Sequence, residues 1–178
     1  TKVRDYQGTG QAMLTGDNSV LVPKPYKALS QAFSTAKTGD TILIAPGNYD
    51  GSVNCNLDVK NLLLGIENLV NTPIQATGSN VFNLNSRPIH VDCGGLHPWL
   101  ACSDSSLKIK GVNLENAFST EKWGSGLSAD KCNVDIYSST IKNSTAPMGG
   151  AIYSKKGDIK LTDTKIYESK ALKKGGGI

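Results

Sequence analysis

The sequence predicts an all-β fold, a parallel β-helix or solenoid, from three observations. Short segments of alternating apolar residues recur about every 25 residues, glycines recur between them, and long helical patterns are lacking. The chain has 178 residues, of which 38% are hydrophobic and 19 are glycine, enough for one core with frequent chain reversals. We expect a single domain, with a cap over about residues 1–40 and coils over about residues 41–178.

Three segments define the first half of the repeat. They read LKIKGVNLENA from Leu107, VDIYSSTIKNS from Val134 and IKLTDTKIYES from Ile159, and they start 27 and then 25 residues apart. Apolar residues at the first and third positions predict a strand with one buried face, and another apolar residue follows after a bend. A helical repeat would space apolar residues by three and four, and a β-sandwich is the other all-β alternative.

The second half of the repeat has the same period. Leu127, Ile152 and Ile178 each follow a glycine, and Ala146 and Ala171 keep the same spacing. In a solenoid, like residues of successive coils lie on one another, so we expect Ile178 to lie over Ile152. We also expect further coils or a partner at the carboxyl-terminal end, because an open solenoid end exposes apolar side chains and unpaired strand groups.

The amino-terminal part predicts a capping helix followed by the first strand. The segment YKALSQAFSTAK has one apolar helical stripe, which consists of Leu29, Ala32, Phe33 and Ala36. The segment TGDTILIAPGNY then alternates as a strand whose Ile42 and Ile44 face one way, and Pro46 and Gly47 end it. An amphipathic helix in this place would cover the first coil.

Two sets of segments resemble known families. The order GDTILIAPGNY, VKNLLLGIEN and IHVDCGG resembles the start of pectin-lyase-like right-handed parallel β-helix proteins. The coils LKIKGVNLENA and STIKNSTAPMGGAIYS resemble the GGA[ILV]-and-Asn repeats of chlamydial polymorphic outer-membrane proteins. The resemblance runs from about Lys24 onward and implies a right-handed β-helix. In enzymes of this scaffold, it implies acids, Ca²⁺ ligands and basic residues on the outer face of the middle and later coils.

The outward acids of the repeat do not predict such a catalytic site. They are Asp104, Asp130, Asp135, Asp158 and Asp163. The repeat places Asp135 beside Lys108 and Lys160 instead of beside another acid, which predicts an alternating charge ladder. We therefore expect no catalytic residue, metal or cofactor, and no unsaturated product from polygalacturonate with or without Ca²⁺.

Aromatic and lysine side chains are the candidates for ligand contact. Trp99 follows His97 and Pro98, and Trp123 lies in an insertion that the coil period does not need, so both are candidates for stacking on a sugar ring. Packing of each ring onto the coil is the alternative. The lysines at the glycine corners, which can bind an acidic polysaccharide or discourage edge pairing, are Lys155, Lys156, Lys173 and Lys174.

The asparagine and cysteine residues predict a glycosylation site, an amide ladder between coils and disulfide bonds. Asn143 starts the sequon NST, a glycosylation candidate, and it also repeats Asn116, which predicts an amide ladder between coils. The four cysteines, which allow three pairings, are Cys55, Cys93, Cys102 and Cys132. The short, glycine-containing loop between Cys93 and Cys102 favours that link, whereas Cys55 or Cys132 also suits a buried position.

Net charge and cysteine content limit the partners and the compartment that we expect. The net charge of +4 is modest and mixed, so we expect no nucleic-acid partner, and no apolar run approaches the ~20 residues of a membrane span. Four cysteines without metal-ligand spacing favour an oxidising compartment, so we expect secretion or cell-surface display.

The expected function is a non-catalytic module for adhesion, a structural stalk or carbohydrate contact. Its partner would be a polysaccharide or another surface protein. Two alternatives share the same fold. One is the amino-terminal part of a polysaccharide lyase or glycoside hydrolase with its catalytic coils beyond residue 178, and the other is a phage or appendage fibre.

Overall fold

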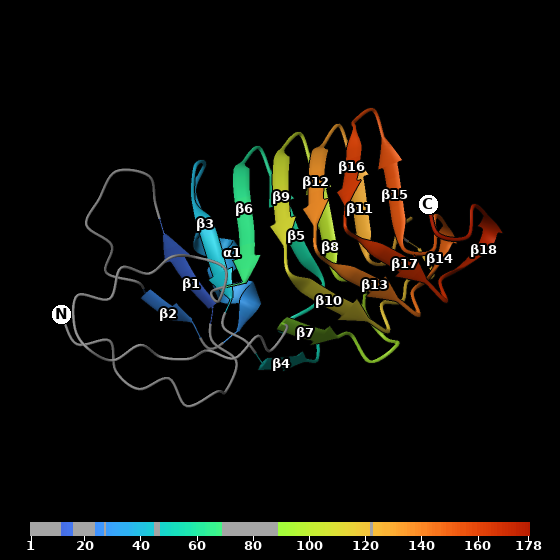
Figure 1. Ribbon diagram of the computed structural model, residues 1–178, viewed down its shortest axis with the longest axis horizontal. Helices are drawn as coiled ribbons and strands as arrows, with labels where there is room; N and C mark the ends of the chain where they lie inside the picture. The colour runs from blue at the N-terminus through green and yellow to red at the C-terminus, as the bar shows by residue number, and fades with distance from the viewer. Residues whose placement is uncertain (1–11, 16–23, 27, 45–46, 69–88, 122) are drawn as a thin grey trace.

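The computed structural model describes residues 12–15, 24–26, 28–44, 47–68, 89–121 and 123–178. These residues form a parallel β-solenoid with one short helix near the amino end (Figure 1). Each pass of the chain places one strand in each of three sheets, which we call sheets 1, 2 and 3. The predicted all-β solenoid is therefore confirmed.

Sheet 1 contains the first strand of each coil. Its parallel strands are β3 (Thr41–Ile44), β6 (Leu63–Asn68), β9 (Ser106–Lys110), β12 (Asn133–Tyr137) and β16 (Ile159–Thr162). At the amino end, β1 (Ala12–Thr15) pairs antiparallel with both β3 and β2 (Lys24–Tyr26). The strands lie side by side along the long axis of the molecule (Figure 1).

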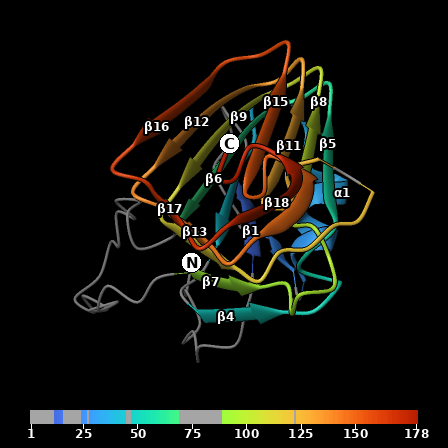
Figure 2. The same cartoon turned by 90° about the vertical axis from the view of Figure 1, so that its right-hand side faces the viewer.

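Sheets 2 and 3 complete each coil. Sheet 2 consists of β4 (Gly47–Asp50), β7 (Ile89–Asp92), β10 (Val112–Glu115), β13 (Thr140–Lys142) and β17 (Lys165–Tyr167). Sheet 3 consists of β5 (Leu57–Lys60), β8 (Leu100–Ser103), β11 (Leu127–Asp130) and β15 (Ile152–Lys155). A short parallel pair, β14 (Thr145–Met148) with β18 (Lys170–Lys174), lies between sheets 2 and 3 in the later coils. Seen end on, the strands surround a common interior (Figure 2).

The register of the strands follows the repeat in the sequence. Val134 pairs with both Leu107 and Ile159, and Leu127 pairs with Ile152. The Ile152 N–H donates to the Gly177 carbonyl oxygen (2.9 Å), as the Leu127 N–H does to Ala151 (2.9 Å). Ile178 is therefore in register with Ile152, as predicted.

The core lies inside the coils and consists of stacked aliphatic residues. Along the strands, buried and outward positions alternate, as in β5 and β12, so that each inward side chain lies on its equivalent in the next coil. Ile42, Ile66, Ile109 and Ile136 are at most 2% exposed. Burial of an Ile side chain stabilises the fold by roughly 1.5–3 kcal/mol, so these stacks are the main source of stability.

The helix α1 (Leu29–Thr35) covers the amino-terminal end, where it contacts β1, β2 and β5. Leu29, Ala32 and Phe33 are buried, and Ala36 packs on the core, as the apolar stripe predicts. Ala28 provides no side-chain cap. Instead, the Leu29 N–H donates to the Asn54 side-chain oxygen (3.0 Å) from the loop after β4.

The corners use residues in the left-handed backbone region. Between sheets 3 and 1, the corner residues with φ between +46° and +56° are Asn61, Asp104, Lys131 and Lys156. Between sheets 1 and 2, Ser138 and Asp163 occupy the place that Gly111 has in the preceding coil. We expected glycine at sharp turns, and Gly149 (φ +54°) confirms this, but most corners carry another residue at a cost of backbone strain.

Candidate functional site

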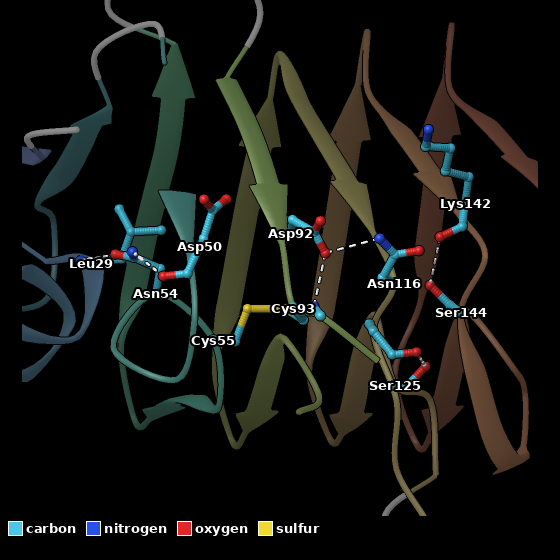
Figure 3. The surroundings of a disulfide bond; sticks show 12 residues. Leu29, Asp50, Asn54, Cys55, Asp92, Cys93, Asn116, Ser125, Lys142 and Ser144 are labelled. Carbon is cyan, nitrogen blue, oxygen red and sulfur yellow. Dashed lines mark hydrogen bonds between the residues drawn. A yellow bond between two sulfur atoms is a disulfide. The ribbon is translucent and has the colours of Figure 1, made fainter. Parts of the chain in front are cut away.

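A ladder of hydrogen bonds joins three coils at the carboxyl ends of the sheet 2 strands. The Asn143 side-chain amide donates to the Asn116 side-chain oxygen (2.6 Å). The Asn116 amide in turn donates to a carboxylate oxygen of Asp92 (2.9 Å), which also accepts the Gly94 N–H (2.8 Å; Figure 3). We call Asp92, Asn116 and Asn143 the amide ladder, and it confirms the predicted stacking of the two asparagines.

Backbone geometry explains why asparagine occupies these positions. Asn116 and Asn143 directly follow β10 and β13 and have φ values of +55° and +49°. Asparagine is among the few residues that adopt this region at low cost, because its short polar side chain bonds locally. Glu168 has the same conformation in the next coil (φ +53°), so the amide series changes to a carboxylate there.

An open cavity of about 330 Å³ lies beside the ladder, and we call it the groove. Its lining carries no charged side chain and consists of Gly94, Gly95, Asn116, Ala117, Phe118, Asn143 and Thr145. Amides, a hydroxyl and a ring edge together offer hydrogen bonds and an apolar contact, the composition of a site for an uncharged polar ligand.

A second cluster lies on the outer face of sheet 2, and we call His90, Glu115 and Lys142 the charged cluster. They come from the adjacent strands β7, β10 and β13. His90 Nε2 lies 2.5 Å from one carboxylate oxygen of Glu115, and the Lys142 ammonium forms an ion pair with the other. Both oxygens of Glu115 are therefore occupied.

These contacts change the acidity of the cluster. The hydrogen bond from Lys142 lowers the pKa of Glu115 below its ordinary value of 4.5, with a further lowering contribution from His90 and an opposing one from burial. The same contact with Glu115 raises the pKa of Lys142. The cluster is a stable ion pair near neutral pH, with Glu115 ionised and Lys142 protonated.

Three acids share one register position on sheet 2, which corrects our expectation that outward acids do not stack. Asp50 pairs with Asp92, and Asp92 pairs with Glu115, on strands β4, β7 and β10. The expected alternation holds on sheet 1, where Asp135 pairs with Lys108 and Lys160. We call Asp50, Asp92 and Glu115 the acid row. The pairing of Asp50 with Asp92 escaped detection because these two residues are 42 positions apart and do not fit the period near 25.

The two tryptophans differ in exposure. Trp99 is 2% exposed, so it packs in the core and offers no stacking surface, and its indole N–H has no hydrogen-bond partner among the described residues. Trp123 is 41% exposed and contacts the ring of Tyr153, with the two ring centroids 4.8 Å apart. Of the two predicted aromatic candidates, only Trp123 is accessible to a ligand.

The candidate lysines form two separate pairs. Lys155 and Lys156 lie at the carboxyl end of β15, whereas Lys173 and Lys174 lie at the end of β18. The Gly149 N–H donates to the Lys174 carbonyl oxygen (3.1 Å), and Gly149 precedes β15, so the pairs are at opposite ends of that strand. The structure does not bring the four together as one cationic patch.

The glycosylation candidate Asn143 is exposed at a corner of the coil. Its side-chain amide is part of the ladder and lines the groove. Glycosylation at this position stays a prediction, and a glycan there would occupy the groove.

All four cysteines form disulfides, but the favoured pairing was wrong. The bonds are Cys55–Cys93 and Cys102–Cys132, with Cα–Cα distances of 5.8 and 6.1 Å (Figure 3 shows the first). Cys93 follows β7 in sheet 2, whereas Cys102 lies on β8 in sheet 3, so the eight-residue segment between them crosses to another side of the coil. Each bond instead joins neighbouring coils.

Several residues of the site were absent from the sequence prediction. They are Asp92, His90, Glu115, Lys142 and Phe118. The alternation in IHVD and VNLE was a usable signal, because it places His90 with Asp92, and Asn113 with Glu115, on outward faces. Their neighbourhood depends on pairing β7 with β10 at an offset of 23 residues, close to the period of the later coils, so extending the repeat toward the amino end was a further usable signal.

Among the described residues, no group of His, Cys, Asp and Glu side chains is arranged to hold a metal ion. In the same part of the chain, no helix is long and apolar enough to cross a membrane. Comparison of the chain with protein-family models, curated proteins and solved structures finds no match. The observations thus establish a parallel β-solenoid with a polar groove, and the comparisons assign it to no family.

Proposed function

We propose that this chain is a secreted or surface-displayed, non-catalytic β-solenoid module that contacts a polysaccharide through the groove. The observation that carries the proposal is the amide ladder. Its amides come from successive coils about 4.8 Å apart, so hydrogen-bonding groups repeat along the solenoid. A polysaccharide that lies along the groove can place successive hydroxyl groups opposite successive amides.

The backbone supports the proposal by holding the ladder in place. Asn116 and Asn143 are held at corners by strand pairing on both sides, and the Asp92 carboxylate bonds both Gly94 and Asn116. A preformed site loses little conformational entropy on binding, which favours affinity for a flexible polysaccharide.

The charged cluster supports a non-catalytic role. Proton abstraction from a sugar requires a base with a free oxygen, and catalysis near neutral pH works best with a pKa near that pH. Glu115 has both oxygens engaged by His90 and Lys142, and its pKa is lowered. This cluster suits structural pairing across three coils better than proton transfer.

Secretion or surface display is proposed from the disulfides. Cys55–Cys93 and Cys102–Cys132 are buried bonds between coils, and structural disulfides of this kind persist in oxidising compartments.

The proposal is tested by calorimetric titration with a panel of soluble polysaccharides. The variant Asn143→Gly removes the amide and keeps the left-handed backbone, so we expect affinity to fall up to about tenfold, the value of one hydrogen bond. Asn113→Ala is the matched control, because Asn113 lies on β10 outside the groove lining. Wild-type binding that Asn143→Gly and Asn113→Ala affect equally would contradict the proposed site.

A second candidate function is favoured by the acid row. Asp50, Asp92 and Glu115 stack on one outer face with His90 nearby, an arrangement of acids and a base that enzymes acting on polysaccharides need. Incubation with polygalacturonate, with and without Ca²⁺, distinguishes the two. We expect no absorbance from double-bond formation. Growth of that absorbance, abolished in Asp92→Asn, would establish a lyase and overturn the non-catalytic proposal.

A further inference from the structure

Trp123 is a large apolar side chain that the fold leaves in contact with solvent. It is 41% exposed, and its ring contacts Tyr153 of β15 with an angle of 59° between the ring planes. Trp123 lies on the insertion between β10 and β11, whereas Tyr153 belongs to β15. The insertion projects from the side of the coil stack (Figure 2). We call Trp123 and Tyr153 the aromatic pair.

The insertion that carries Trp123 is held firmly at both ends. At its start, Thr145 of β14 donates its N–H to the Ala117 carbonyl oxygen (2.9 Å) and accepts the Ser119 N–H (2.9 Å). At its end, the Ser125 hydroxyl, which is fully buried, bonds the carbonyl oxygens of Ala117 (3.0 Å) and Gly150 (2.8 Å). The ring is thus presented by a well-anchored segment.

Gly124 shows how closely the insertion approaches β15. Its φ is +69°, and a Cβ atom there would lie 2.1 Å from the Leu127 carbonyl oxygen and 2.5 Å from the Tyr153 nitrogen. No side chain fits in that space, so glycine is required for the contact. The position of Trp123 next to Tyr153 therefore depends on this glycine.

Strand β14 connects the groove with the insertion that carries Trp123. Ala117 and Phe118 of the same insertion line the groove, together with Thr145 of β14. The Gly124 N–H donates to the carbonyl oxygen of Met148 at the other end of β14 (2.9 Å). Met148 is three positions after Thr145, about 10 Å at the usual rise, so an oligosaccharide with one end at the ladder can extend along β14 to the aromatic pair.

We propose that the aromatic pair is a second subsite for the ligand of the groove, and that the ligand is a pyranose chain with equatorial hydroxyls. This inference rests on the proposed function. A pyranose with equatorial hydroxyls has axial C–H bonds on both ring faces, and these pack on the electron-rich face of an indole. An axial hydroxyl interrupts one of the faces, which makes the aromatic pair selective for ring configuration.

The groove and the aromatic pair contact different parts of the sugar ring. The amides of Asn116 and Asn143 bond sugar hydroxyls at the edge of the ring, whereas Trp123 covers a face. Because the groove lining carries no charge, a neutral chain fits it without leaving a buried ion unpaired.

Acrylamide quenching of tryptophan fluorescence tests the second subsite in the unmodified protein. Trp99 is 2% exposed, so quenching reports Trp123 almost alone. We expect cellohexaose to bind and to protect Trp123 from quenching, and we expect a galactan oligomer, whose rings carry an axial hydroxyl, to bind at least fivefold more weakly.

Variants provide an independent readout. Trp123→Ala removes the ring, and the loss of one aromatic contact predicts about a five- to tenfold weaker affinity for cellohexaose. Trp123→Phe should retain most of the affinity. Gly124→Ala keeps the tryptophan but displaces the insertion, so it should weaken binding as Trp123→Ala does, while circular dichroism confirms that each variant is folded.

The outcomes separate the two proposals. If cellohexaose binds and Asn143→Gly weakens it, but Trp123 stays fully quenchable and Trp123→Ala binds normally, the second subsite is wrong and the proposed function stands. Equal affinity for cellohexaose and the galactan oligomer overturns the ring-configuration selectivity. If no polysaccharide binds the wild-type protein, both proposals fail.

Discussion

At the scale of single residues, backbone strain in the solenoid is concentrated at corner residues other than glycine. Lys156 is an exposed corner residue with φ +56° between β15 and β16. An ordinary L-residue in this region costs roughly 1–2 kcal/mol relative to a right-handed conformation, and glycine avoids the cost. Such corners are therefore positions where the natural residue is not the most stable one.

Lys156→Gly is expected to raise the free energy of unfolding by about 0.5–1 kcal/mol, because the relief of strain exceeds the added flexibility of the unfolded chain. The matched control is Lys155→Gly, at an exposed strand position of β15. This variant should lower the free energy of unfolding by about the same amount. Urea denaturation measures both. A destabilising Lys156→Gly would show that the corner strain is smaller than the φ value indicates.

The charged cluster predicts how stability depends on pH. The folded-state pKa of Glu115 lies below its ordinary value, so the stabilisation is fully present above about pH 4.5 and is lost as the pH falls through the folded-state pKa. We expect the difference in unfolding free energy between wild type and Glu115→Gln to shrink as the pH is lowered from 6 to about 3. Denaturant midpoints at several pH values measure it, and a constant difference would contradict the ionic contribution.

At the scale of secondary-structure elements, a residue from a neighbouring loop supplies the cap of α1. Asn54 is 9% exposed, accepts the Leu29 N–H and donates to the Asp50 carbonyl oxygen (2.9 Å; Figure 3). It thus connects the helix to the first coil.

Asn54→Ala is expected to destabilise the chain by about 1–2 kcal/mol, because it leaves a buried helix N–H and a carbonyl oxygen unpaired. Asn54→Asp retains the acceptor for Leu29 and should recover part of this loss. Thermal unfolding monitored by circular dichroism compares them. Equal stability of Asn54→Ala and wild type would show that water replaces the cap.

The elements that were predictable from sequence are those with a regular repeat. The stacks through Val134 and Leu127 followed directly from the period, and the apolar stripe of α1 predicted its buried face. The pairing of Asp50 with Asp92 and the bond between Cys55 and Cys93 were not predictable, because both depend on a coil of irregular length. Local alternation marks which residues face outward, but only the register shows which outward residues meet.

At the scale of the whole molecule, the two disulfides connect consecutive coils. They close segments of 38 and 30 residues, which in the chain-entropy model stabilises the fold by roughly 3.5–4 kcal/mol each. Their positions relative to the groove differ, since Cys93 lies between Asp92 of the ladder and Gly94 of the groove lining, whereas Cys102 lies on β8 of sheet 3.

Removing either disulfide is expected to cost about 2–4 kcal/mol of unfolding free energy. Only the double variant that combines Cys55→Ala with Cys93→Ala should also weaken polysaccharide binding, because the loss of this bond loosens the turn that orients Asp92 toward Asn116. The second pair, Cys102→Ala with Cys132→Ala, is the control for stability without a change at the groove. Equal binding by the two double variants, measured well below their melting temperatures, would contradict this link.

The central claim is that a polysaccharide lies along the amide ladder, and an NMR titration with cellohexaose tests it most directly. The side-chain amide signals of Asn116 and Asn143 and the backbone signal of Gly94 should shift together and saturate at one ligand concentration. Signals of the outer face of sheet 1, such as those of Lys108 and Asp135, should not move. Saturable shifts on sheet 1 with the ladder signals unchanged would contradict the account.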